Sequence, residues 1–152
     1  MRSPILNILS YTREIVIICT FFTLLYLQSI HVVYFIICAI LTTLIAKVLK
    51  KIIKQPRPQQ TKKKTSYGMP SSHSAAISFF TTYLQCVVMA IPGTKAKLFM
   101  LAFHCFSLAV IWSRVSLGHH TRAQVIAGTF LGIVCASISF MLWQHYLPVL
   151  LQ

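Results

Sequence analysis

Two histidines and three basic residues have the types and spacing that chemistry on a phosphate group needs. His73 follows two serines at the start of an apolar run, and His120 stands four residues before Gln124 at the start of another. Histidine can attack phosphorus or move protons near neutral pH, whereas lysine and arginine offset the charge of phosphate oxygens. The candidate cations are Lys50, Arg57 and Arg114. Together these residues indicate phosphoryl transfer without a metal.

The segment before the first of these runs reads Tyr-Gly-Met-Pro-Ser-Ser-His-Ser over residues 67–74. Consecutive serines, Ser71 and Ser72, are good N-caps, and a helix N-terminus binds anions through its backbone N–H groups. At this position His73 can hold or deliver a proton to the bound anion. Taken alone, the segment fits a plain capped helix start with a surface histidine equally well.

The second histidine segment covers residues 113–124 and reads Ser-Arg-Val-Ser-Leu-Gly-His-His-Thr-Arg-Ala-Gln. If residues 120–124 are helical, Gln124 lies one turn from His120 on the same face. Its amide oxygen can then accept a hydrogen bond from one imidazole nitrogen and leave the other as a nucleophile. The alternative is a pair of interfacial polar residues at the end of a membrane span.

Lys50 and Arg57 are seven residues apart, about two helical turns, so they can face the same way if the helix persists that far. Pro56 and Pro58 are expected to end the helix there. The alternative is a basic cluster that contacts anionic lipid. That interpretation is preferred for the neighbouring lysines, which are Lys47, Lys51, Lys54 and residues 62–64.

The composition describes a membrane-embedded chain. It has 152 residues, is 57% hydrophobic, and carries 14 Lys and Arg against one acidic residue, Glu14, for a net charge of +13. Two-carboxylate hydrolysis and carboxylate-held calcium or magnesium sites are excluded, so no metal or cofactor is expected. The basic residues lie at the ends of apolar runs. The predicted anionic partner is therefore a lipid headgroup or phosphate substrate and not a nucleic acid.

The apolar runs predict one all-α, polytopic domain over residues 1–152, with about five transmembrane helices. Residues 15–46 would form a helix of about 48 Å, too long for one crossing of about 30 Å, and are expected to divide near residues 28–31. The other expected spans are 73–92, 98–112 and 123–146. A cleaved signal peptide is the less favoured interpretation of the first span, because no cleavage signal follows it. Five cysteines without CxxC spacing favour packing over zinc or disulfides.

Two crossings separate residues 55–72 from residues 115–121. The two segments are therefore expected on the same face of the bilayer, and the loop over residues 92–97 on the other. All the candidate chemistry falls into the two same-face segments.

Three spaced motifs in the order Lys50-x6-Arg57-Pro58, Pro70-Ser71-Ser72-His73 and Ser113-Arg114-x5-His120 resemble the type 2 phosphatidic acid phosphatase superfamily. Vanadium haloperoxidases are its soluble relatives. The resemblance covers residues 47–124 and implies the fold of that superfamily. It also implies that His120 forms a phosphohistidine and that His73 is the general acid. The implied phosphate-binding residues are Lys50, Arg57, Ser71, Ser72 and Arg114.

Two residues depart from the usual pattern of that superfamily. Ser72 stands where glycine is usual, and Gln124 where aspartate is usual. An amide can orient His120 but cannot stabilise an imidazolium with a full charge. Both departures resemble the dolichyl diphosphate phosphatase branch, which implies conversion of dolichyl diphosphate to dolichyl phosphate and phosphate in the endoplasmic reticulum membrane. The alternatives are a broad phosphatidate or lipid phosphate phosphatase and a non-catalytic protein that binds lipid phosphates.

The side of the membrane that the site faces stays open. With five spans, all basic residues except Lys95 and Lys97 lie on the site's side, so the positive-inside rule predicts a cytosolic site. The resemblance to dolichyl diphosphate phosphatases implies a lumenal site. The oligomeric state is not predicted.

Overall fold

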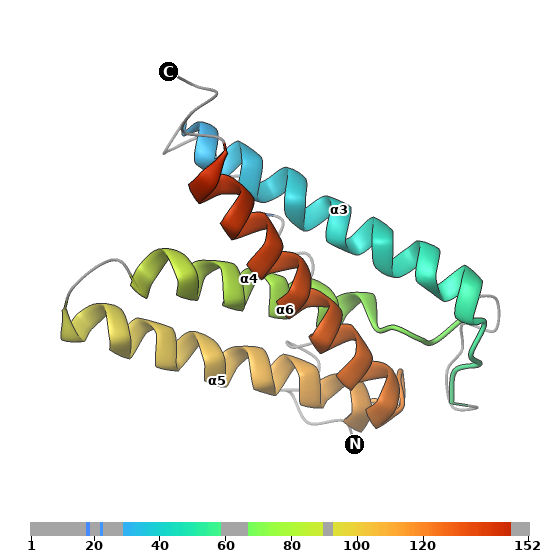
Figure 1. The fold of residues 1–152 in the computed structure, drawn as a ribbon. Coiled ribbons are helices and arrows are strands. Elements are labelled where there is room, and N and C mark those ends of the chain that lie inside the picture. The colour runs from blue at the N-terminus through green and yellow to red at the C-terminus, as the bar shows by residue number, and fades with distance from the viewer. Residues whose placement is uncertain (1–17, 19–21, 23–28, 59–66, 90–92, 147–152) are drawn as a thin grey trace.

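A computed structural model describes residues 18, 22, 29–58, 67–89 and 93–146, and within them four helices have defined bounds (Figure 1). They are α3 (Ile30–Ile53), α4 (Ser72–Met89), α5 (Thr94–Ser116) and α6 (Arg122–His145). The all-helical architecture predicted from the sequence is confirmed. The expected first span, within residues 15–27, falls outside the described residues apart from two isolated positions.

Three of these helices, α3, α5 and α6, are long and apolar enough to cross a membrane. The helix α4 is not among them, although residues 73–92 were expected to form a span. It is shorter and rich in serine and threonine, and it packs against all three other helices. Its hydroxyl side chains are mostly buried against protein. The described residues therefore contain four helices with defined bounds and three candidate spans, and the expected count of about five is not confirmed.

The second of the two spans expected from the first apolar run is present, and it begins where the division was predicted. Helix α3 begins at Ile30, and Ser29 before it has an extended backbone. At the other end Lys54 adopts a left-handed conformation, with φ of 52°, and its N–H still bonds to the carbonyl of Lys50. Pro56 follows directly, and its ring prevents the helix from continuing. Helix α3 therefore ends one turn before Arg57.

The largest interface joins α4 and α6, and small residues make it possible. Gly128, Gly132 and Ala136 are spaced four residues apart on α6 and are buried. A Cβ atom on Gly128 would collide with the carbonyl oxygen of Ser71, and one on Gly132 with that of Ala75. Small residues at this spacing let two helix backbones approach closely in a membrane. The close approach also places the start of α4 against the start of α6.

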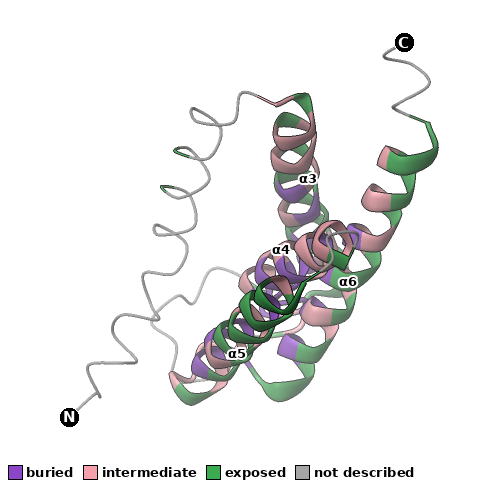
Figure 2. Cartoon of the chain, turned by 90° about the vertical axis from the view of Figure 1, so that its left-hand side faces the viewer, coloured by how far each residue is buried: buried purple, intermediate pink, exposed green. Residues whose placement is uncertain are grey.

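Aromatic packing holds the half of the bundle that lies away from the starts of α4 and α6. Phe79 and Tyr83 on α4 are buried, and the Tyr83 hydroxyl lies 2.8 Å from Nε2 of His31 on α3. The His31 ring stacks on Trp143 of α6 at a centroid distance of 4.2 Å. Buried residues line the contacts between helices, whereas much of the outer surface of α3, α5 and α6 is exposed (Figure 2). That outer surface is largely apolar, as expected for helices that face lipid.

Candidate active site

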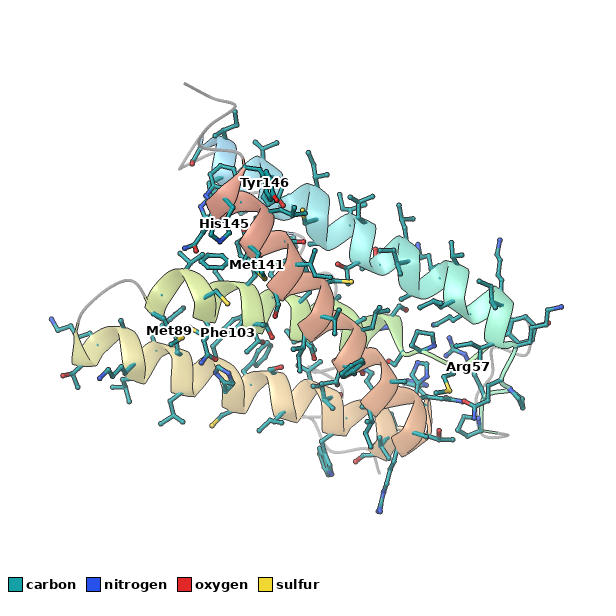
Figure 3. All side chains as sticks on the ribbon, in the orientation of Figure 1. Arg57, Met89, Phe103, Met141, His145 and Tyr146 are labelled. Atoms are coloured by element: carbon teal, nitrogen blue, oxygen red, sulfur yellow. The ribbon has the colours of Figure 1, made fainter. Side chains whose placement is uncertain are left out.

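The two segments expected on one face of the bilayer do meet. The N–H of Gly68 donates to the carbonyl of Gln55 at 2.7 Å, and the N–H of Ser71 donates to the carbonyl of Gln124 at 2.9 Å. The loop after α3, the loop before α4 and the turn between α5 and α6 therefore form one connected end of the bundle. Arg57 lies at this end, and Met89 and Tyr146 lie toward the other (Figure 3).

A tight turn after α5 carries His120 into the protein interior. Gly118 has φ of 69°, a left-handed conformation that glycine adopts without strain. The turn lets the N–H groups of His119 and His120 both reach back to the carbonyl of Arg114, at 3.1 and 3.2 Å. His120 is only 4% exposed. Its position is thus fixed by the end of α5 before α6 begins.

The contact between His120 and Gln124 is present, but it does not arise from a helical turn. Helix α6 begins at Arg122 with Thr121 as its N-cap, so His120 precedes the helix. Gln124 forms a capping box, in which its N–H donates to the Thr121 hydroxyl and its side-chain oxygen accepts from the Thr121 N–H. The same oxygen, Oε1, lies 3.2 Å from Nδ1 of His120.

Backbone groups fix the orientation of the Gln124 amide. Its Nε2 donates to the carbonyl of Pro56 at 2.9 Å and to Oε1 of Gln55 at 3.1 Å. A proline carbonyl can only accept and the Thr121 N–H can only donate, so the amide cannot be reversed without losing both bonds. Oε1 therefore faces His120 and requires Nδ1 to carry the proton. In the neutral ring, Nε2 then holds the lone pair.

Helix α4 begins beside Lys50. The ammonium of Lys50 donates to the Ser72 hydroxyl at 3.3 Å, and Lys50 is 9% exposed. The Ser71 oxygen accepts from the N–H and the hydroxyl of Ser74, at 3.4 and 3.0 Å, which is the contact of a helix N-cap. His73 lies next to Ser72 in the first turn of α4 and is partly buried. The N-terminus of α4 and Lys50 of α3, both expected at the site, are therefore adjacent.

Arg57 and Arg114 lie on different elements from Lys50, and Arg114 joins this region through its backbone carbonyl. The condition for Lys50 and Arg57 to face the same way along one helix is not met, because α3 ends at Ile53 and Arg57 lies in the loop that follows. Arg114 lies in the last turn of α5 and is 5% exposed. Arg57 and Lys50 each act electrostatically on His120. The described residues contain no aspartate or glutamate, so no carboxylate among them balances these cations.

The environment of His120 keeps its ring neutral. Burial, followed by the positive charges of Arg57 and Lys50, lowers the pKa of His120 from 6.5 to about 4. Hydrogen bonds to Gln124 and to the backbone of Gly68 act in the opposite direction. Burial also lowers the pKa of Arg57. No carboxylate among the described residues balances Arg57 and Lys50. The two positive charges therefore favour the binding of an anion beside the neutral imidazole.

Sequence reasoning did not identify Gln55 and Gly68 as parts of this site. Gly68 is buried, and a Cβ atom there would collide with the Gln124 amide. Gln55 stands immediately before Pro56 and contacts Gln124 from 69 positions away. A signal for Thr121 was available, because threonine followed three residues later by glutamine is a capping-box pattern.

Comparison with known proteins places the chain in a family. The sequence pattern of the PAP2 superfamily matches residues 31–147. A lipid phosphate phosphatase epsilon 2 from Arabidopsis thaliana is 32% identical over 111 residues, covering 72% of this chain and 38% of that protein. Dolichyldiphosphatase 1 of Dictyostelium discoideum is 42% identical over 93 residues, covering 57% of this chain and 41% of that protein.

Human dolichyldiphosphatase 1 is 30% identical over 163 residues, which cover 99% of this chain and 68% of that protein. The chain thus spans about two-fifths to two-thirds of the length of these relatives. A crystal structure of a transmembrane PAP2-type phosphatidylglycerolphosphate phosphatase from Bacillus subtilis has the same fold. Its TM-score is 0.75 at 20% identity, over 96% of this chain and 80% of that one. The chain belongs to the PAP2 superfamily.

Proposed function

We propose that this chain is a metal-independent membrane lipid phosphatase in which His120 attacks the terminal phosphorus of a lipid-linked substrate. The single observation that carries the proposal is a buried histidine, held through Nδ1 by Gln124 and subject to the positive charges of Lys50 and Arg57, with no carboxylate among the described residues. Such an arrangement favours an anion at the histidine and offers no ligand set for magnesium. The similarity to dolichyldiphosphatases and lipid phosphate phosphatases supports the same reaction class.

In the proposed first step, the lone pair on Nε2 of His120 attacks phosphorus and the bond from phosphorus to the leaving oxygen breaks. His73 protonates that oxygen, and the shortened lipid remains in the bilayer. Gln124 keeps the proton on Nδ1, which accounts for the nucleophilic character of Nε2. In the second step water attacks the phosphorus of the phosphohistidine, and His73 takes a proton from the water. The bond between phosphorus and Nε2 of His120 breaks, which releases inorganic phosphate and regenerates His120.

The residues assigned to phosphate binding come from four elements. Lys50 acts as a point charge, and the two arginines suit forked contacts to phosphate oxygens. The Ser72 hydroxyl is already oriented by Lys50, and the Ser71 hydroxyl lies at the N-cap of α4. The set consists of Lys50, Arg57, Ser71, Ser72 and Arg114. Preorganised donors of this kind stabilise the charge that develops on the equatorial oxygens.

The proposed substrate is dolichyl diphosphate, which would yield dolichyl phosphate and inorganic phosphate. Support comes from the similarity to three proteins named dolichyldiphosphatase, from Dictyostelium discoideum, Saccharomyces cerevisiae and Homo sapiens. A location in the endoplasmic reticulum membrane belongs to the same proposal.

The test is phosphate release by the purified protein in detergent, with dolichyl diphosphate and phosphatidate compared at equal surface concentration. A kcat/KM at least about tenfold higher for dolichyl diphosphate, a difference of about 1.4 kcal/mol, is expected. A preference for phosphatidate would contradict the proposed substrate and would indicate a phosphatase of broader specificity for lipid phosphates. Binding of both lipids without phosphate release would identify a non-catalytic protein and contradict the proposal.

A further inference from the structure

Gln55 connects the loop after α3 to both groups that contact the His120 ring. Its side-chain oxygen accepts a hydrogen bond from Nε2 of Gln124 at 3.1 Å, and its backbone carbonyl accepts from the N–H of Gly68 at 2.7 Å. Gln124 and the backbone of Gly68 both hydrogen-bond to His120. Neither of these two bonds joins Gln55 directly to the imidazole. Any effect on the reaction would therefore pass through the residues that hold His120.

All four hydrogen-bonding positions of the Gln124 amide are used, and Gln55 occupies one of them. Gln124 is fully buried, and its amide makes four hydrogen bonds, two at Oε1 and two at Nε2. One N–H of Nε2 donates to Pro56, and the second donates to Gln55. A buried N–H group that loses its acceptor is strongly unfavourable, so the amide would shift to find another. That shift would move Oε1 away from Nδ1 of His120.

We propose that Gln55 is a positioning residue for the hydrolysis: it holds the Gln124 amide against His120, so that residue 55 sets the orientation and the proton affinity of the nucleophile. This inference rests on the proposed function. It adds a third member to a hydrogen-bonded chain that runs from Gln55 through Gln124 to His120. Every link in that chain is neutral.

The charged groups that face His120 make residue 55 a sensitive position. Arg57 from the loop and Lys50 from α3 are positive, and Arg114 at the end of α5 holds the His120 backbone. Among the described residues nothing negative opposes them. A glutamate at position 55 would still accept a hydrogen bond from the Gln124 N–H. Its negative charge would be separated from the His120 ring by only two hydrogen bonds. A leucine would have a similar size but no acceptor.

The experiment compares kcat, KM and the pH dependence of kcat/KM for Gln55→Glu, Gln55→Leu and Lys51→Gln. Lys51 is exposed in the last turn of α3 and has no assigned role in the site. Its replacement by glutamine changes the net charge by the same −1 as Gln55→Glu, so it is the matched control. The substrate is dolichyl diphosphate in detergent at fixed ionic strength.

Gln55→Glu is expected to keep kcat within about threefold of wild type and to move the acidic limb of kcat/KM upward by about one pH unit. The sign follows because a negative charge near the imidazole favours its protonated form. Lys51→Gln is expected to move the limb by less than about 0.3 unit, since solvent screens an exposed charge. Gln55→Leu is expected to lower kcat at least about tenfold with KM within about threefold, because the amide that orients His120 is displaced while the phosphate-binding residues remain.

Equal shifts of the limb in Gln55→Glu and Lys51→Gln would overturn the inference, because the effect would then be a general one of net charge. A wild-type kcat in Gln55→Leu would overturn it as well. If Gln55→Leu fails to fold in a thermal-unfolding assay, the comparison of Gln55→Glu with Lys51→Gln decides alone. Failure of the proposed function is recognised separately, since wild-type protein would then release no phosphate or His120→Asn would release it normally.

Discussion

The low pKa of His120 makes a quantitative prediction for the pH dependence of hydrolysis. Burial and the charges of Arg57 and Lys50 hold this pKa at about 4, whereas an unperturbed histidine titrates at 6.5. The nucleophile must be neutral, so lowering the pKa preserves activity as the pH falls. At pH 5.5 a histidine with a pKa of 6.5 would be neutral in about 9% of molecules, against about 97% for His120. Activity at pH 5.5 should therefore exceed that of an ordinary histidine nucleophile about tenfold.

The assay is kcat/KM from pH 3.5 to 8, because this parameter reports ionisation of the free enzyme. The expected acidic limb lies near pH 4. The limb in kcat should lie at higher pH, because a bound phosphate places negative charge next to His120 and favours its protonated form. Two substrates whose phosphates ionise at different pH values distinguish enzyme from substrate, since a limb that belongs to His120 stays at the same pH with both. Assays returned to pH 7 after acid exposure exclude irreversible unfolding.

An acidic limb near pH 6.5 in kcat/KM, at the same pH with both substrates, would refute the reasoning. It would mean that the nucleophile titrates as a solvated histidine and not as a buried one beside two cations.

Three substitutions test how the fold supports the site. Gly68→Ala should lower kcat/KM about a hundredfold with little loss of expression, because its Cβ would displace the Gln124 amide; unchanged kinetics would contradict the contact. Gly132→Val should destabilise the protein by about 1–3 kcal/mol or more, seen as a lower unfolding temperature in detergent, because α4 lies against this glycine; an unchanged temperature would place the helices further apart. Thr121→Val should lower the free energy of unfolding by about 1 kcal/mol through loss of the N-cap of α6. An unchanged unfolding temperature in the same assay would contradict a stabilising role of this cap.

The order of the motifs and the apolar runs was sufficient to predict the helical architecture and the meeting of distant loops. Two crossings were expected between residues 55–72 and 115–121, which would place both segments on a common face. The segments do meet, although α4 is not among the helices long and apolar enough to cross a membrane. The position of α4 was not predicted, because an apolar average over residues 73–92 does not show which face its serines and threonines occupy. The four-residue spacing of Gly128, Gly132 and Ala136 on α6 was a signal for that close packing.

The roles assigned to the site residues stay predictions, and the sequence predicted only part of the geometry around His120. The spacing of His120 and Gln124 suggested a helical neighbour pair, whereas the contact depends on a capping box at Thr121. The contact of Gln124 with Gln55 could not be predicted, because many polar side chains on the same loops could accept an amide N–H. In the structure Gly68 lies close to the Gln124 amide, and the Pro56 carbonyl accepts one of its N–H groups while Gln55 accepts the other.

The role of His120 is tested most directly by phosphate release from dolichyl diphosphate by His120→Asn in excess EDTA. Asparagine retains an N–H that can donate to Oε1 of Gln124, so the capping of α6 should persist, while the nucleophilic nitrogen is lost. Wild-type protein should keep its full rate in EDTA, and the variant should release phosphate at least about a thousandfold more slowly with an unchanged unfolding temperature. Release by the folded variant within tenfold of wild type would show that phosphorus is attacked by some other group.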